Sequence, residues 1–317
     1  MIIKDASFEI LERDEARGGL SIIETAGRTC YKSEHHIADG SAKRFIESCI
    51  RRRHESILEH GDYIFLLDDE KIYDNVAEEM RTISETRGYA PHICMTNIAH
   101  RPIVSGNIRA WRELINASTA GLYFTGRIDP IYTADIRSNT PEAWWQDAPD
   151  PRVHQITYGD LKGLTEHMAH QRQTVRFIVD RGISHEIVRH RKFSFAQEST
   201  RYCNYANERF GGEITVIRPC YLDEGTEGYA LWKRQCMSAE AAYFTMLKLG
   251  HTPQEARAVL PTSTKTEIIA TGTLGDWERF FDLRARQKTG PVHPQMLEVA
   301  APLLKMDAAL IPNIFEY

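Results

Sequence analysis

The side chains with the clearest chemical potential lie between residues 189 and 202, in the run Arg-His-Arg-Lys-Phe-Ser-Phe-Ala-Gln-Glu-Ser-Thr-Arg-Tyr. Five of these fourteen residues are Arg, Lys or His, although the whole chain is acidic. Guanidinium groups bind phosphate through paired N–H donors, and hydroxyl groups add further donors. A solvated basic surface is the alternative, but Phe193, Phe195 and Tyr202 alternate with the charges, and such rings favour burial. The segment therefore predicts a binding site for an anion such as phosphate.

The elements that must position this segment can be read from the spacing of apolar residues. Helices are predicted over Ala42–Arg53, Lys71–Ser84, Gly228–Lys248 and Leu297–Leu304. Another helix should begin at Thr252-Pro253-Gln254-Glu255, which has the hydroxyl, proline and acid of a capping box. Strands are predicted for the short β-branched or aromatic runs Tyr63–Leu67, Thr174–Val179, Ile214–Ile217 and Thr266–Ala270.

Helices and strands are mixed without a steady β-α-β rhythm. We therefore expect an α+β fold with a central mixed or antiparallel sheet flanked by helices. Neither an internal repeat nor a linker-like break is evident, so a single domain over residues 1–317 is expected. The stretch Ala117–His154 contains Asp-Pro twice, Thr-Pro and Ala-Pro, and is expected to be irregular surface chain.

Composition and missing motifs exclude several classes of protein. The 39 Lys and Arg residues against 44 Asp and Glu give a net charge of −5, which argues against a general nucleic-acid-binding protein. No uncharged apolar run of about 18 residues is present, which argues against a membrane protein. The six cysteines are scattered, so we expect no zinc or disulfide framework and a cytoplasmic location. His54 and His60 lack the four-residue spacing of zinc-binding helices, so no metal site is predicted.

Several segments together resemble one known family. Arg189-His190-Arg191, followed after seven residues by Ser199, is similar to the R-H-R-x7-S signature of the flavin-dependent thymidylate synthases. Ser199–Tyr202 resembles the family's S-x-R-Y. Further segments match in order: Arg28–Ser33 resembles R-x-C-Y-x-S, His54–His60 resembles H-x-S-x-x-E-H, Ala256–Pro261 resembles A-R-x-x-L-P, Phe280–Arg284 resembles H-F-x-x-L-R, and His293–Met296 resembles H-P-Q-M.

This resemblance implies the reductive methylation of dUMP to dTMP. Methylenetetrahydrofolate would donate the carbon, NADPH would reduce the bound FAD, and the flavin would carry the redox chemistry. Because sites in this family are assembled between the subunits of a homotetramer, a homotetramer is implied here as well. Residues at about 69–172 are an insertion that compact members of the family lack.

The resemblance also implies roles for individual residues. Arg284 would be the catalytic cation that stabilises negative charge on the N3/O4 side of uracil. The implied FAD ligands are Ser56, Arg189, His190, Arg191, Gln197 and Arg279. The implied dUMP ligands are Glu186, Arg189, Glu198, Ser199, Arg201, Arg257 and Arg284, with Arg201 and Arg257 on the phosphate. His54 and His60 would face flavin or folate, or be structural.

Some positions depart from the family pattern and leave alternatives open. Thr273 and Gly275 stand where Asn-x-Arg is usual, and Glu186 stands where Gln is common. A carboxylate at 186 would accept a hydrogen bond from an amino group, so a relative acting on dCMP or UMP is one alternative. A non-catalytic protein that binds nucleotides or RNA is another. Ser105–Trp111, inside the insertion, resembles the missing Asn-x-Arg-x-Trp element, or is simply a helix start capped by Ser105.

Overall fold

The computed structural model describes residues 1–12, 18–89, 91–98, 101–161, 167–207, 211–312 and 314–316. The chain forms two compact units. The first unit combines Met1–Leu11, Arg28–Glu34 and Thr174–Tyr317, and the second combines Glu12–Gly27 with His35–Gln173. The predicted insertion at about 69–172 lies in the second unit, and its residues 90, 99–100 and 162–166 are outside the described residues. The single catalytic domain stays a prediction.

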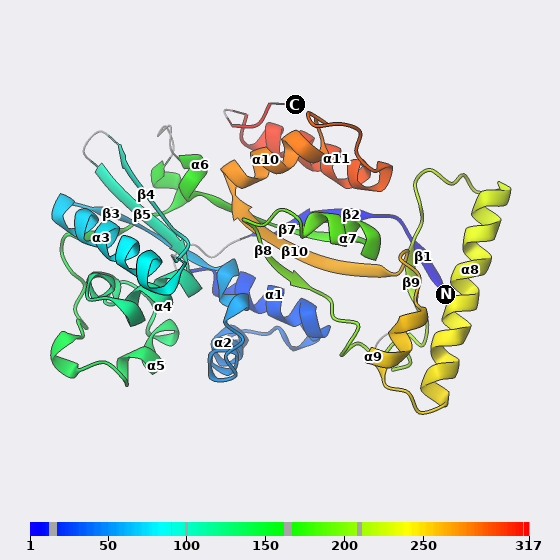
Figure 1. Ribbon diagram of the computed structural model, residues 1–317, viewed down its shortest axis with the longest axis horizontal. Helices are drawn as coiled ribbons and strands as arrows, with labels where there is room; N and C mark the ends of the chain where they lie inside the picture. Colours follow the sequence, from blue (N-terminus) through cyan, green and yellow to red (C-terminus); the bar gives the residue numbers. More distant parts are fainter. Residues whose placement is uncertain are drawn as a thin grey trace. The chain divides into compact units, whose positions relative to one another are not determined.

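In the described part of the first unit, four strands form one sheet (Figure 1). Its order is β2-β7-β10-β8, with bounds Ser7–Ile10, Arg172–Asp180, Lys265–Thr273 and Ser194–Gln197. β2 pairs antiparallel with β7, and β8 pairs antiparallel with β10. A separate parallel pair joins β1 (Ile2–Lys4) to β9 (Thr215–Ile217). The strands predicted in this part of the chain are therefore confirmed.

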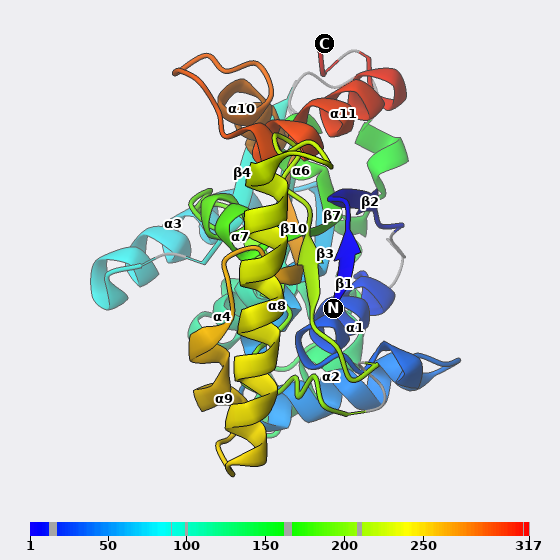
Figure 2. The ribbon, with the colours of Figure 1, turned by 90° about the vertical axis from the view of Figure 1, so that its right-hand side faces the viewer.

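The helices of the first unit carry much of its motif sequence. Their bounds are α7 Arg181–Ile187, α8 Glu227–Lys248, α9 Pro253–Ala256, α10 Leu274–Arg284 and α11 Pro294–Leu310. α8 runs beside β1 and β9 (Figure 2) and buries Cys236 and Tyr243 in a cluster with Ile214 and Val216. α9 begins with the predicted capping box. α11 extends beyond the predicted Leu297–Leu304 at both ends, and at its start the first turn accommodates Pro294.

The described part of the second unit has a four-stranded sheet of its own. Its order is β4-β5-β3-β6, with bounds Ile93–Ile98, Arg101–Asn107, Asp62–Leu67 and Val153–Gln155, and each neighbouring pair is antiparallel. Its helices are α1 Leu20–Tyr31 (whose last turn belongs to the first unit), α2 Ser41–Arg51, α3 Glu70–Arg87, α4 Ile108–Ala117, α5 Ala134–Arg137 and α6 His167–His170. Every helix in the described residues is too short or too polar to span a bilayer. The α+β prediction is confirmed, although the strands are divided between sheets.

The stretch Ala117–His154 is only in part the irregular surface chain that its prolines predicted: most described residues of 137–152 are exposed, whereas its first half contributes to the core. It contains 3-10 turns at Ala120–Phe124 and Pro130–Tyr132. Phe124 and Tyr132 are fully buried, and the Phe124 ring packs against Trp111 of α4 with centroids 4.7 Å apart. Turns of this length leave no periodic apolar pattern, so their burial cannot be read from the sequence.

The two four-stranded sheets share one strand order, although the edge strand β6 follows β5 in the chain whereas β2 precedes β7. The order β6-β3-β5-β4 in the second unit corresponds to β2-β7-β10-β8 in the first. β3 and β7 are each followed by a helix, and β5 and β10 lead directly into α4 and α10. Each of these last helices carries a fully buried tryptophan, Trp111 or Trp277, whose ring packs on a phenylalanine of the central strand, Phe65 in β3 or Phe177 in β7. The second unit thus repeats the central architecture of the first.

The strand registers of the two sheets agree as well. Cys94 pairs with Ser105 across β4 and β5, and Ser194 pairs with Thr271 across β8 and β10. In both sheets the second residue of the pair is followed by a glycine, Gly106 or Gly272, and then by the N-cap residue of a helix, Asn107 or Thr273. The expectation of no internal repeat was therefore wrong. The repeat is hidden in the sequence because few positions are shared and because α8 and α9 lie between β8 and β10.

Candidate functional site

Arg284, the expected catalytic residue, ends α10 and contacts two other predicted site residues. Its Nη1 donates to Glu186 Oε2 at 2.9 Å, and its Nη2 donates to the Glu186 carbonyl oxygen at 3.4 Å. Its Nε donates to His190 Nε2 at 3.1 Å. The short helix α7, which carries Glu186, is capped by Asp180, whose side chain accepts from Ile183 N at 2.8 Å. A guanidinium has five N–H donors. These contacts use three of them, so two remain for a ligand.

His190 is held in its neutral form in this cluster. Its Nε2 accepts from Arg284, so this nitrogen carries no proton. Burial, followed by the positive charges of Arg284 and Arg279, lowers the pKa of His190 from 6.5 to about 4. The imidazole ring packs on Phe280 with centroids 4.9 Å apart. Near neutral pH the cluster therefore contains a guanidinium, a carboxylate and an uncharged imidazole.

The basic loop between α7 and β8 separates its cations from its aromatic rings. Arg189 and Arg191 are exposed, as is Arg279 of α10, and these three guanidinium groups form no ion pair with any described residue. Phe193 is buried and packs edge to face on Trp277, with centroids 4.7 Å apart. The ring anchors the loop in the core, while the arginines stay accessible to a ligand.

Ser199 and Arg201 lie beside the N-terminal motif Arg28–Ser33. Ser199 N donates to the Cys30 carbonyl oxygen at 3.0 Å. Ser199 Oγ in turn accepts from Arg201 N at 3.3 Å. The exposed Arg201 guanidinium lies over the Tyr202 ring, 5.5 Å from its centroid. The fold thus brings two motifs that are far apart in the sequence into direct contact.

Glu198, an expected dUMP ligand, lies in a buried ion-pair network. Its Oε2 accepts from Lys265 Nζ at 2.8 Å, while Glu267 binds Lys265 at 2.7 Å and Lys32 at 2.5 Å. Burial would raise the pKa of Glu267, but the charges of Lys265 and Lys32 outweigh it and hold that pKa at about 2. Because Lys32 belongs to Arg28–Ser33, the network fixes that motif to β10. A contact between Glu198 and substrate stays a prediction.

Gln197, an expected FAD ligand, is half-buried on β8. Its Nε2 donates to Ser184 Oγ of α7 at 2.9 Å and to Thr266 Oγ1 of β10 at 3.1 Å. The side chain therefore holds α7 against the sheet, which helps to fix the position of Glu186 on the same helix. Its contact with FAD stays a prediction.

Arg257 lines a cavity of 320 Å³ in the first unit. Its Nη1 donates to Thr200 Oγ1 at 3.3 Å, and Arg181 and His185 of α7 line the same cavity. Arg181 Nη1 is buried without a hydrogen-bond partner in the described part of the chain. Two guanidinium groups and a hydroxyl suit a phosphate. Arg201, the other expected phosphate ligand, is not among the lining residues.

Sequence reasoning missed three residues of this cavity, Arg181, His185 and Thr200. Thr200 alone left a signal, because it stands inside the S-x-R-Y motif. Arg181 and His185 reach the cavity through the placement of α7 after β7, which no local pattern reveals.

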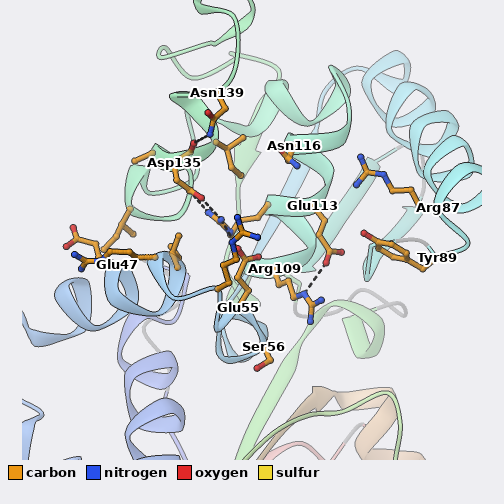
Figure 3. A pocket seen from close by; sticks show the side chains of 17 residues that line it. Glu47, Glu55, Ser56, Arg87, Tyr89, Arg109, Glu113, Asn116, Asp135 and Asn139 are labelled. Carbon is orange, nitrogen blue, oxygen red and sulfur yellow. Dashed lines mark hydrogen bonds and ion pairs between the residues drawn. The ribbon is translucent and has the colours of Figure 1, made fainter.

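Ser56, an expected FAD ligand, lies in the second unit. It is exposed on the 3-10 helix Glu55–His60 and lines a cavity of 920 Å³ together with residues of the insertion. In Figure 3 it lies at one edge of this cavity, apart from the charged side chains around Arg109. His60 of the same helix is fully buried, whereas His54 before it is exposed.

The segment Ser105–Trp111 forms a helix start that is capped by Asn107, and not by Ser105 as one prediction had it. Asn107 Oδ1 accepts from Ala110 N at 2.8 Å. Arg109 Nη1 donates to Glu59 Oε1 at 2.7 Å, so this element contacts the His54–His60 motif directly. At the equivalent helix start of the first unit, Thr273 is the cap and Gly275 provides no guanidinium.

Comparison with known proteins relates most of the chain to one family. Residues 13–72 and 156–313 match the family described as thymidylate synthase complementing protein. The unmatched segment between them, residues 73–155, falls inside the predicted insertion.

Two relatives that match this chain are named flavin-dependent thymidylate synthases. A flavin-dependent thymidylate synthase of Corynebacterium glutamicum is 30% identical over 192 residues, which cover 53% of this chain and 72% of the relative. A flavin-dependent thymidylate synthase of Pyrococcus furiosus is 34% identical over 195 residues, which cover 61% of this chain and 70% of the relative. Among solved structures, the UMP/dUMP methylase PolB from Streptomyces cacaoi, bound with 5-Br dUMP, has a TM-score of 0.41 at 16% identity, covering 98% of this chain and 94% of that one.

Proposed function

Because the chain belongs to the family of thymidylate synthase complementing proteins and is a methyltransferase enzyme, we propose that it converts dUMP to dTMP by FAD-dependent reductive methylation. Methylenetetrahydrofolate is the proposed carbon donor and NADPH the proposed reductant. One observation carries the proposal: α7 supplies Glu186 to the Arg284 cluster and His185 to the Arg257 cavity. A single short helix thereby connects a fixed cation for the base with a cavity for the phosphate.

The proposed dUMP site uses both of these places. Arg257 binds the phosphate with Arg181 and Thr200, whose donors line one cavity. Arg284 stabilises the negative charge that develops on the N3/O4 edge of uracil, using the two N–H donors that its own chain leaves available. Glu186 holds the guanidinium in place, so little reorganisation accompanies the reaction. Arg189, Ser199, Arg201 and Glu198 remain proposed dUMP contacts or supports of those contacts.

The residues proposed for FAD have a suitable set of donors. When bound, FAD supplies the hydride for the transferred carbon. Arg189, Arg191 and Arg279 are exposed and form no ion pair in the described part of the chain, so their guanidinium groups can bind a diphosphate. His190 accepts at Nε2, which leaves Nδ1–H as a donor for the cofactor. Ser56 and Gln197 complete the proposed set.

A homotetramer with sites shared between subunits and a cytoplasmic location are also proposed. The family resemblance supports the first, since Arg189 is expected to contact both FAD and dUMP. Cysteine chemistry supports the second: in the described part of the chain none of the six cysteines forms a disulfide bond, as in a reducing compartment. Light scattering of the purified protein tests the tetramer, and cell fractionation tests the location.

The proposed reaction is tested with the purified full chain, dUMP, methylenetetrahydrofolate and NADPH. We expect a flavin absorption band, its bleaching by NADPH without oxygen, and formation of dTMP. Parallel reactions with UMP and dCMP test the alternative substrates. Because Arg284 already binds the Glu186 carboxylate, that carboxylate is not available to the amino group of dCMP, and we expect dCMP not to replace dUMP. A protein that takes up no flavin, or that turns over dCMP or UMP faster than dUMP, would refute the proposal.

A further inference from the structure

The shared strand order identifies the part of the second unit that corresponds to the basic loop of the first. Ile93 and Phe193 occupy equivalent positions, because each lies against the glycine that precedes a helix cap. A Cβ atom added to Gly106 would have Ile93 as its nearest neighbour at 2.6 Å, and one added to Gly272 would have Phe193 at 2.8 Å. Counting back from these two residues, Tyr89 takes the place of Arg189. The chain between α3 and β4 is therefore the counterpart of the loop to which the R-H-R motif belongs.

This counterpart borders the cavity of 920 Å³, which we call the α3–α4 cavity. Its lining from the insertion includes Arg87, Tyr89, Arg109, Arg112, Glu113 and Asp135. These residues all lie within 73–155, the segment that the family model does not match. Ligand pockets usually measure about 300–1,000 Å³, so the cavity is large enough for a nucleotide.

Two of the lining arginines are neutralised by the protein itself. Arg112 binds Glu55 at 3.1 Å and Asp135 at 2.8 Å, and Arg109 binds Glu113 at 3.0 Å. Arg112 is 5% exposed, and its Nε has no hydrogen-bond partner in the described part of the chain. Figure 3 shows Arg109 with its partner Glu113 in the cavity lining. The paired charges of Arg109 and Arg112 fix the walls of the site, and because these two arginines face three lining carboxylates, the group contributes a net charge of −1.

The remaining charges make the cavity cationic. Arg51, Arg53 and Arg87 line it, are exposed and form no ion pair with any described residue. Among the lining carboxylates, only Glu47 likewise lacks an ion pair in the described part of the chain. The five lining arginines against four lining carboxylates leave a net charge of +1, and the three unpaired guanidinium groups attract an anion.

The same cavity has an aromatic surface next to a cation. Tyr89 is 47% exposed, and Figure 3 shows its ring beside the Arg87 side chain at the end of α3. Nucleobases stack on exposed aromatic rings, while guanidinium groups bind the phosphates that follow them. We propose that the α3–α4 cavity binds the nucleoside diphosphate part of a ligand, with the base on Tyr89 and the diphosphate at Arg87. FAD and NADPH both contain such a part as ADP, and only the choice of these two as candidate ligands rests on the proposed function.

The test is isothermal titration of the full chain with ADP, FAD and NADPH. The variants are Arg87→Met and Tyr89→Leu, with Arg81→Met as the matched control. Arg81 lies on the same helix α3 but pairs with Glu78 and Glu85 and does not line the cavity. We expect both cavity variants to weaken ADP binding at least about tenfold, because each loses a charged hydrogen bond or a stacking surface. The control should stay within about twofold of the wild type.

Loss of FAD affinity in the cavity variants would assign the cavity to the flavin, and loss of NADPH affinity would assign it to the reductant. The proposal is overturned if the wild type does not bind ADP, if the cavity variants bind it as the wild type does, or if Arg81→Met loses affinity equally. A chain that binds ADP through Arg87 but takes up no FAD and forms no dTMP would refute the proposed reaction and leave this site standing.

Discussion

The sheets of the two units have the same strand order and register, yet the side chains at equivalent loop positions differ in charge. The first unit has Arg189 where the second has Tyr89. In the other direction, the second unit has Arg109 where the first has Gly275. The positions that stay alike are buried or conformationally restricted, and those that differ are mostly at the surface. One set of residues therefore fixes the arrangement of the sheet and helices and another carries the chemistry, so the arrangement alone does not reveal function.

The largest expected effect on the free energy of unfolding concerns the buried tryptophan of each unit, and it tests whether the two sheets and their helices are packed in the same way. Trp111 and Trp277 are both fully buried in the first turns of their helices. We expect Trp111→Ala and Trp277→Ala each to lower the free energy of unfolding by about 3–5 kcal/mol, since each leaves a large cavity. Urea unfolding measures both. A loss below about 1 kcal/mol in one variant alone would show that its helix is not packed as the comparison requires.

The next prediction tests whether Arg284 has a catalytic role that the equivalent position of the second unit lacks. Arg284→Ala should lower dTMP formation by about 100- to 1,000-fold, as expected for the loss of a fixed group that stabilises developing charge. The equivalent position of the second unit is Ser118, and Ser118→Ala is the control. Among the described residues its hydroxyl accepts only from Gly121 N, at 3.4 Å, so activity should stay near that of the wild type. Steady-state assays with folded variants decide this. Near-normal turnover in Arg284→Ala would remove its catalytic role.

Each unit also contains a histidine whose pKa is lowered to about 4, the half-buried His190 in the first and the buried His170 in the second. For His170 the cause is burial, and its ring nitrogens lie 2.7 Å from Thr96 Oγ1 and Ser105 Oγ. Since the unfolded state has the ordinary pKa of about 6.5, it binds more protons than the folded state between pH 4 and 6.5. The free energy of unfolding therefore rises with pH across this window and falls on acidification.

For His170 the full effect is roughly 3 kcal/mol between pH 7 and pH 4. Urea unfolding at a series of pH values measures it, with His170→Gln as the variant that cannot titrate. We expect a flatter pH profile for this variant than for the wild type. Parallel profiles would mean that His170 titrates normally in the folded protein.

A smaller effect distinguishes the two glycines that precede the helix caps. A Cβ at Gly272 would lie 2.8 Å from the ring of Phe193, which is wedged against Trp277 and cannot yield. A Cβ at Gly106 would lie 2.6 Å from Ile93 Cδ1, the end of a flexible side chain. We expect Gly272→Ala to cost about 1–3 kcal/mol of unfolding free energy, and Gly106→Ala less. Equal losses in urea unfolding would contradict this difference.

Some elements and contacts of the molecule could be predicted from the sequence, and others could not. The strands and the long helices were predictable because apolar spacing reports them directly, as over Tyr63–Leu67 and Gly228–Lys248. The contact of Arg284 with Glu186 was not, because the two residues meet only when α7 and α10 lie on the same sheet. The repeat stayed hidden because a buried tryptophan, a glycine and a capping side chain are too few to be seen between dissimilar surfaces.

The smallest effect concerns the helix caps, where the two units use different residues for one task. Asn107 Oδ1 accepts from Ala110 N at 2.8 Å, and Thr273 Oγ1 accepts from Asp276 N at 3.1 Å. Asn107→Ala and Thr273→Ala should each cost about 1 kcal/mol of unfolding free energy. Thr273→Asn, which introduces the residue of the second unit, should cost less than about 0.5 kcal/mol, because Asn and Thr are similar caps. If urea unfolding shows Thr273→Asn to be as unstable as Thr273→Ala, the hydroxyl has a partner role that an amide cannot fill, and the two helix starts are not interchangeable.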